Sequence, residues 1–287
     1  MSNYFYNLCD DILLIIISFI VEPKYKLLKW IDNTKIDLYY LCANPSPNVF
    51  NYILENYNIN DINWHVISMN PSAIKFIEKN IINGNNNVNW AVLSKNPAAV
   101  HILENNINKI DWSMLLENES MEAITLLCKY PDKINNKIFR NKYAVKMIED
   151  NINNIEPEDW YNIASNINAI HIIENNMDKI HNSNAIHILC KNENAIHIIE
   201  KLDTNNINWY NLCSNKNAIH IIRKNMDKII WDALCMNTSK EAMEMLENNM
   251  DKIQYMMLSM NPSIFEVDIK ATTELYKEYT ESLFYSK

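Results

Sequence analysis

Glycine is almost absent from the sequence, since Gly84 is the single glycine among 287 residues. Phosphate-binding loops and the nucleophile elbow of serine hydrolases place two or more glycines at fixed spacings, where the backbone must approach a ligand or turn sharply. A chain with one glycine can contain neither kind of motif. The sequence therefore argues against nucleotide-binding enzymes with such loops and against hydrolases that carry the elbow.

Arginine is nearly as rare, and the charge balance is acidic. Arg140 and Arg223 are the only two arginines, and the formal net charge is −9. Nucleic-acid-binding surfaces depend on clustered basic side chains that neutralise phosphates. We therefore expect no nucleic-acid partner.

Long apolar runs and paired cysteines are also missing. The apolar run 12–21 has about half of the ~20 residues that a membrane-spanning helix needs. Asp10 and Asp11 precede it, in place of the basic residues of a signal peptide. Six cysteines without paired spacing are typical of reduced thiols. We expect a cytoplasmic protein with no membrane partner.

The chain is instead dominated by asparagine, isoleucine and an internal repeat. It contains 48 Asn and 44 Ile, and the segments that begin at Trp90, Trp160 and Trp209 are copies of one pattern. The repeat starts lie 22 to 26 residues apart, at Leu38, Trp64, Trp90, Trp112, Asn135, Trp160, Ile186, Trp209, Trp231 and Tyr255. A Leu or Ile follows each start by three residues, and an Asn follows by six: Asn44, Asn70, Asn96, Asn118, Asn141, Asn166, Asn192, Asn215, Asn237 and Asn261.

This regular phase predicts two short helices in each unit. An Asn between two helices can cap a helix end, and a proline directly after it, as at Pro97, suits a first helical turn. Apolar residues of the second helix, such as Ile172 and Ile173, share a face that one helix pair cannot bury alone. We therefore predict an all-α fold, an elongated α-solenoid of about ten helical hairpins over residues 37–265. The repeat tryptophans should begin the first helices, and helices over 1–36 and 266–287 should cap the two ends.

The N-terminal segment that begins at Leu8 has a second interpretation. It resembles the F-box, a short helical module, through Leu8, Asp11, Ile12, Leu13, Ile16, Ser18 and Phe19. The proline usual in that module is replaced by Cys9. In the F-box family the module binds a Skp1-type adaptor and connects a substrate-binding domain to a cullin ubiquitin ligase. The resemblance implies adaptor contacts by Leu8, Leu13, Ile16 and Phe19; the alternative is a hydrophobic helix that only caps the first repeat.

The repeats themselves resemble the Asn-rich short-helix repeat proteins of giant DNA viruses of amoebae. The resemblance covers most of the chain, from about residue 38 to about residue 265, through the Trp, Leu–Ser, Asn–Pro and Lys–Ile–Asp segments of each unit. It implies a viral protein that acts in the host cytoplasm. It implies no activity, because such proteins mostly have no assigned biochemical role.

One position of the second helix is polar in eight of the ten units and points away from the apolar stripe. We interpret it as an exposed row, either simply solvated or part of a partner-binding surface. Neighbouring units of stacked helices lie ~10 Å apart, so the row cannot bind one metal ion by stacking alone. The candidate partner-binding residues of this row are Lys75, His101, Lys146, His171, His197 and His220.

No residue cluster of the sequence is singular, as an active site normally is. Cys42, Cys190, Cys213 and Cys235 share the repeat position that serine fills in other units, which is typical of packing rather than nucleophilic catalysis. We therefore expect no enzyme, no cofactor and no metal, but a protein–protein interaction scaffold, which the N-terminal resemblance would make an F-box-like substrate receptor. The alternative is a structural protein of a viral particle or viral factory.

Overall fold

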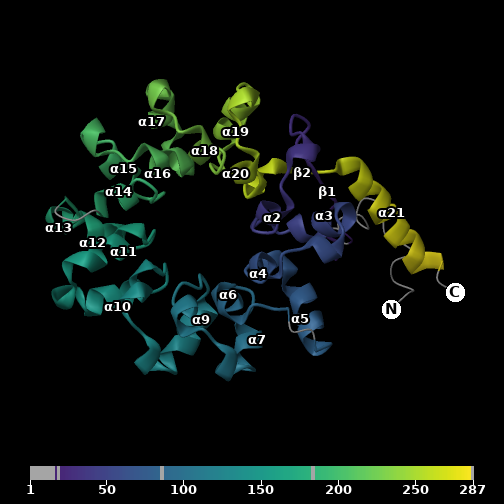
Figure 1. The fold of residues 1–287 in the computed structure, drawn as a ribbon, viewed down its shortest axis with the longest axis horizontal. Helices are drawn as coiled ribbons and strands as arrows, with labels where there is room; N and C mark the ends of the chain where they lie inside the picture. Colours follow the sequence, from purple (N-terminus) through teal and green to yellow (C-terminus); the bar gives the residue numbers. More distant parts are fainter. Residues whose placement is uncertain (1–16, 18–19, 85–86, 182–184, 286–287) are drawn as a thin grey trace. The chain divides into compact units, whose positions relative to one another are not determined.

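The computed structural model describes residues 17, 20–84, 87–181 and 185–285, and within that part the chain is mostly helical (Figure 1). Contacts divide the chain into two compact units, residues 34–263 and the two flanks 1–33 and 264–287. The first of these, residues 34–263, holds the repeats. The all-α class predicted from the sequence is confirmed.

The first α-helices of the repeats begin at the predicted residues, except that the helix predicted from Ile186 begins at Ala185. Their bounds are α2 (Leu38–Leu41), α4 (Trp64–Ile67), α6 (Trp90–Lys95), α8 (Trp112–Leu115), α11 (Trp160–Ser165), α14 (Ala185–Leu189), α16 (Trp209–Ser214), α18 (Trp231–Leu234) and α20 (Tyr255–Ser259). The unit of Asn135 differs, because a 3-10 helix, η7 (Asn136–Arg140), replaces the first α-helix. A side-chain cap fixes several starts: Asn89 Oδ1 accepts from Val92 N, and Asp111 Oδ1 accepts from Met114 N.

The second helices follow the repeat asparagines. They are α3 (Val49–Asn56), α5 (Ile74–Ile82), α7 (Val100–Glu104), α9 (Met121–Cys128), α10 (Val145–Asp150), α12 (Ile170–Glu174), α15 (Ile196–Ile199), α17 (Ile219–Lys224) and α19 (Lys240–Glu247). Ile172 and Ile173 are buried as predicted. The last unit has no second α-helix: the 3-10 helix η14 (Pro262–Ile264) leads directly into a strand.

A third short element connects most units. It is α13 (Met177–His181) in one unit and a 3-10 helix in others: η3 (Ile59–Asp61), η5 (Ile107–Lys109), η6 (Pro131–Lys133), η8 (Ile152–Asn154), η10 (Thr204–Asn206), η12 (Met226–Lys228) and η13 (Met250–Lys252). These turns were not predicted, because three residues are too few for a periodic apolar pattern.

The part of the chain that holds all the repeats, residues 34–263, closes on itself. Helix α2 packs against α20, and Asp37 N donates to Ser259 Oγ at 3.0 Å. Asn44 Nδ2 donates to the carbonyl oxygens of Ser259 and Asn261, both at 2.9 Å. The first and last repeats are therefore neighbours, and residues 34–263 form a ring rather than the elongated array that we predicted. Repetition alone does not fix curvature, so the sequence could not distinguish the two.

The flanking unit contains a strand pair that joins the two ends of the chain. Strand β1 (Tyr25–Leu27) pairs antiparallel with β2 (Phe265–Val267), with Lys26 opposite Glu266. Lys24 N donates to Thr272 Oγ1 of helix α21 (Ile269–Tyr285) at 2.9 Å. Residues 25–27 are therefore a strand within the region 1–36 where we predicted only helices, whereas a C-terminal helix is present.

The described residues contain no helix with both the length and the apolar character required to cross a bilayer.

Candidate interaction surfaces

The repeat asparagines form a continuous hydrogen-bonded series that we call the Asn ladder. In every unit, Nδ2 donates to two backbone carbonyls of the preceding unit, at distances from 2.7 to 3.3 Å. One acceptor is the carbonyl of the preceding ladder Asn, so Asn70 donates to Asn44 O and Asn96 donates to Asn70 O. Because Asn44 donates to Asn261 O, the series runs around the whole ring.

The ladder side chains are buried, and both Nδ2 donors of each are used within the ring, so they are not accessible to a ligand. Oδ1 accepts a bond within its own unit, for example from Asn168 N to Asn166 at 3.0 Å and from Ala98 N to Asn96 at 3.0 Å. The ladder asparagines are at most 2% exposed. The predicted capping role is therefore confirmed for Oδ1, while the inter-unit role of Nδ2 was missed.

A second buried series uses the Ser or Cys that stands two residues before the ladder Asn in seven of the ten repeats. Ser94 Oγ accepts from Asp111 N at 3.0 Å, and Cys213 Sγ accepts from Ile230 N at 3.4 Å. Burial raises the pKa of Cys42 and of Cys235 to about 11, and it also raises the pKa of Cys190 and of Cys213. These thiols are protonated near neutral pH, which disfavours nucleophilic chemistry.

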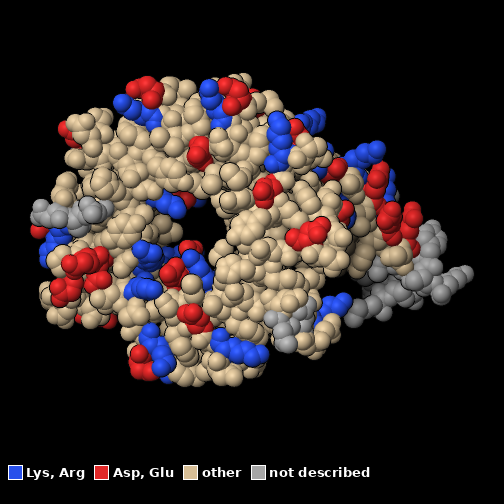
Figure 2. Space-filling view, viewed as in Figure 1, with Lys and Arg blue, Asp and Glu red and all other residues tan. Residues whose placement is uncertain are grey.

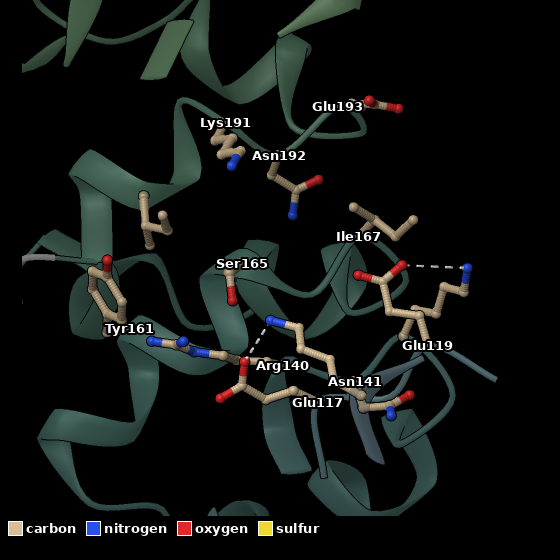
Figure 3. A pocket seen from close by; sticks show the side chains of 13 residues that line it. Glu117, Glu119, Arg140, Asn141, Tyr161, Ser165, Ile167, Lys191, Asn192 and Glu193 are labelled. Carbon is tan, nitrogen blue, oxygen red and sulfur yellow. Dashed lines mark hydrogen bonds and ion pairs between the residues drawn. The ribbon is translucent and has the colours of Figure 1, made fainter. Parts of the chain in front are cut away.

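Charged side chains gather on part of the inner wall of the ring. They surround an open pocket of about 490 Å³ (Figure 3). In Figure 2, blue and red side chains lie along the left-hand wall of the central opening, whereas the opposite wall is mainly tan. We call this set the charged arc: Lys95, Glu117, Glu119, Arg140, Lys142, Lys191 and Glu193.

Two repeat positions supply the charged arc, five and seven residues after each start. Arg140, Ser165 and Lys191 hold the first position in three successive units, and all three line the pocket. Across the ring the same two positions are uncharged, and we call them the apolar arc: Ala43, Pro45, Met69, Pro71, Met236 and Met260. This contrast was not predicted, although the variation between otherwise similar repeats was a usable signal.

The predicted row on the second helices is exposed. His101, His171, His197 and His220 have side chains between 44% and 57% exposed. Each ring reaches a glutamate of the preceding unit, and the Nε2–Oε1 distances are 3.5 Å to Glu78, 3.1 Å to Glu149, 2.6 Å to Glu174 and 2.8 Å to Glu200. We call these four contacts the His–Glu row.

The other candidates of this row are lysines. Lys75 is exposed, and Lys146 Nζ lies 2.8 Å from Asp150 Oδ1. Hydrogen bonding to Asp150 raises the pKa of Lys146. Among the residues that the structure describes, no three His, Cys, Asp or Glu side chains converge as metal ligands would.

The predicted adaptor-binding residues Leu8, Leu13, Ile16 and Phe19 lie outside the described residues. No family model, curated protein or solved structure matches this chain. The surfaces of the ring are therefore the basis for a functional proposal.

Proposed function

We propose that this chain is a non-enzymatic protein-binding scaffold, a closed α-helical repeat ring whose inner wall holds a partner protein. The observation that carries the proposal is that some repeat positions are constant from repeat to repeat, whereas others vary. Positions that hold the ring together have the same residue type in each unit, as the ladder asparagines do. Positions on the inner wall change from Arg140 to Ser165 to Lys191 in successive units. Repeat proteins gain specificity in this way, by variation on one continuous face.

The environments of the ladder asparagines and of the charged arc also indicate that the first hold the ring together and the second can bind a partner. The polar atoms of the ladder side chains are buried and paired within the ring, so they cannot bind a partner. The charged arc lies around an open pocket with Tyr161, Ile167 and Ile188 among its lining residues. Mixed apolar and charged groups at an open surface are typical of protein interfaces.

Affinity capture from amoebal lysate tests this function directly. The wild-type chain is compared with an inner-wall variant, Tyr161→Ala with Ile188→Ala, and with an outer variant, His197→Ala with His220→Ala. We expect a stoichiometric captured protein that the inner-wall variant loses and the outer variant retains. Retention by the first variant and loss by the second would move the binding surface to the outside of the ring, and failure of the wild type to capture any protein would contradict the proposal.

We further propose that the N-terminal segment connects the ring to a Skp1-type adaptor, so that the bound protein becomes a ubiquitination substrate. The support for this step is the sequence resemblance at Leu8, Leu13, Ile16 and Phe19. Calorimetry with purified Skp1 should show binding by the wild type and none by the double variant Ile16→Asp with Phe19→Asp, while thermal unfolding of the repeats is unchanged. Equal binding by that variant would exclude the adaptor role. Capture of capsid or core proteins would instead favour a structural role in a viral particle.

A further inference from the structure

The charged arc carries an unbalanced positive charge at its pocket. Each of the three glutamates that line the pocket has a lysine partner: Lys95 Nζ lies 3.0 Å from Glu117, Lys142 Nζ lies 3.7 Å from Glu119, and Lys216 Nζ lies 2.7 Å from Glu193. Arg140 and Lys191 also line the pocket, and within the described chain neither forms an ion pair. Two cations therefore face the pocket without a counter-charge.

The structure holds Arg140 by contacts that leave most of its donors free. Its Nε donates to Asn162 Oδ1 at 2.7 Å, and its guanidinium carbon lies 5.5 Å from the centre of the Tyr161 ring. These contacts orient the planar group without neutralising it, and the terminal nitrogens remain able to bind a carboxylate in a bidentate manner. In the view of Figure 3, Ser165 lies between Arg140 and Lys191.

The repeat register sets the extent of the site. Arg140 and Lys191 hold the same position in units that are separated by the Trp160 unit. Stacked helices are spaced by ~10 Å, so one small anion is too short to satisfy both cations unless their side chains converge. A ligand with several carboxylates along an extended chain can reach both.

We propose that the charged arc binds an acidic segment of a partner polypeptide, with carboxylates at Arg140 and at Lys191. This inference rests on the proposed function and specifies the chemistry of the partner. An acidic peptide is favoured over a nucleic acid because two unpaired cations at the pocket can match separate carboxylates of a peptide but are too few to neutralise a continuous phosphate backbone. The apolar side chains of the wall also suit the mixed side chains of a peptide.

Selection from a phage-displayed random-peptide library provides the test, with the full chain immobilised as bait. The matched baits are Arg140→Gln with Lys191→Gln and, as a control of equal charge change, Lys201→Gln with Lys224→Gln. All four residues are exposed, so both double variants should fold. A fluorescein-labelled copy of the most enriched peptide, and a labelled oligothymidine, are then titrated by anisotropy.

We expect wild-type and control baits to enrich peptides rich in Asp and Glu, and the pocket variant to lose this bias. The labelled peptide should bind the pocket variant about tenfold more weakly, as expected for loss of two partly exposed ion pairs. Enriched peptides without an acidic bias, or equal affinity for both variants, would overturn the acidic-segment site while leaving the scaffold function intact. Absence of any enriched peptide, or tighter binding of oligothymidine, would also overturn this site, whereas lysate capture decides the scaffold function separately.

Discussion

The Asn ladder and the His–Glu row both connect neighbouring repeats, but they do so in opposite environments. The ladder is neutral, buried and present in all ten units. The His–Glu row is formed by charged or chargeable groups that are about half exposed, and it joins four pairs of units. Recurrence in the sequence therefore does not by itself identify the contacts that hold a repeat protein together.

The physical difference lies in what replaces each contact when it is lost. Water can solvate an exposed imidazole or carboxylate, so loss of an exposed pair costs little. Water cannot reach the carbonyls that the ladder amides bind, so loss of an amide leaves buried acceptors without donors. Substitutions in the two series should accordingly differ widely in cost.

The largest expected effect comes from a carboxylate in the ladder. Asn166 is fully buried and donates to Phe139 O at 3.0 Å and to Asn141 O at 2.7 Å. Asn166→Asp replaces both donors by an acceptor that faces two carbonyls, so we expect a loss of about 4 kcal/mol or more in the free energy of unfolding, measured by urea titration.

The pH dependence of that variant sharpens the test. Burial without donors raises the pKa of the new carboxyl in the folded state above its unfolded value, so the folded state binds more protons and stability falls as pH rises. The loss should therefore be smaller near about pH 5 than near about pH 8. Asn205→Asp, at an exposed position, should change stability by less than about 0.5 kcal/mol; a similar loss in both variants would contradict the ladder account.

The next largest effect concerns Asn44, whose side-chain hydrogen bonds to the last repeat close the ring. Asn44→Ala removes two bonds to the last unit, and we expect it to cost about 2–4 kcal/mol, as Asn166→Ala should. In an open array Asn44 would have no preceding unit and its Nδ2 would have no such acceptors. A cost for Asn44→Ala well below that for Asn166→Ala, in the same urea titrations, would argue for an open array.

A smaller effect is expected in the Ser and Cys series. Ser94→Ala leaves Asp111 N without its acceptor and should cost about 1–2 kcal/mol. Ser94→Cys should cost less than about 1 kcal/mol, because Cys213 accepts an equivalent bond in another unit. Thermal unfolding of the two variants measures the difference, and equal losses would show that the acceptor does not matter.

The smallest loss of stability is expected from substitutions in the exposed His–Glu row. Changing His171, His197 and His220 together to Ala should lower stability by no more than about 1 kcal/mol, because each removes one exposed contact. Moderate salt should reduce even that difference, since it screens exposed pairs. A loss comparable to that of a ladder variant would remove the distinction between the two series.

Much of the local structure could be predicted from the sequence, because it depends on periodicity and capping. The starts of α6, α11 and α16 at tryptophans follow from the phase of the repeat. The pairing of β1 with β2 could not be predicted, since three residues carry little pattern and the partner strand lies at the other end of the chain. The function of Nδ2 in the ladder was also beyond prediction, because its acceptors belong to the preceding unit.

The candidate sites were less predictable than the fold. Exposure of His101, His171, His197 and His220 follows from the helical period and is confirmed, but a binding role for them stays a prediction. The charged arc depends on ring closure, since only a ring has an inner wall. The sequence shows that its residues occupy varied repeat positions. It does not show that they line one pocket, because that depends on how the chain curves.

Ring closure is tested most directly by a distance between the first and last repeats. Spin labels at Tyr39→Cys of α2 and Met256→Cys of α20 use two exposed positions, in a background with Cys9→Ser and Cys128→Ser. The remaining cysteines are buried with raised pKa values and should not react with the label. Double electron–electron resonance should give one distance below about 25 Å, whereas an open array with ~10 Å per unit would place the labels beyond about 60 Å and contradict the ring.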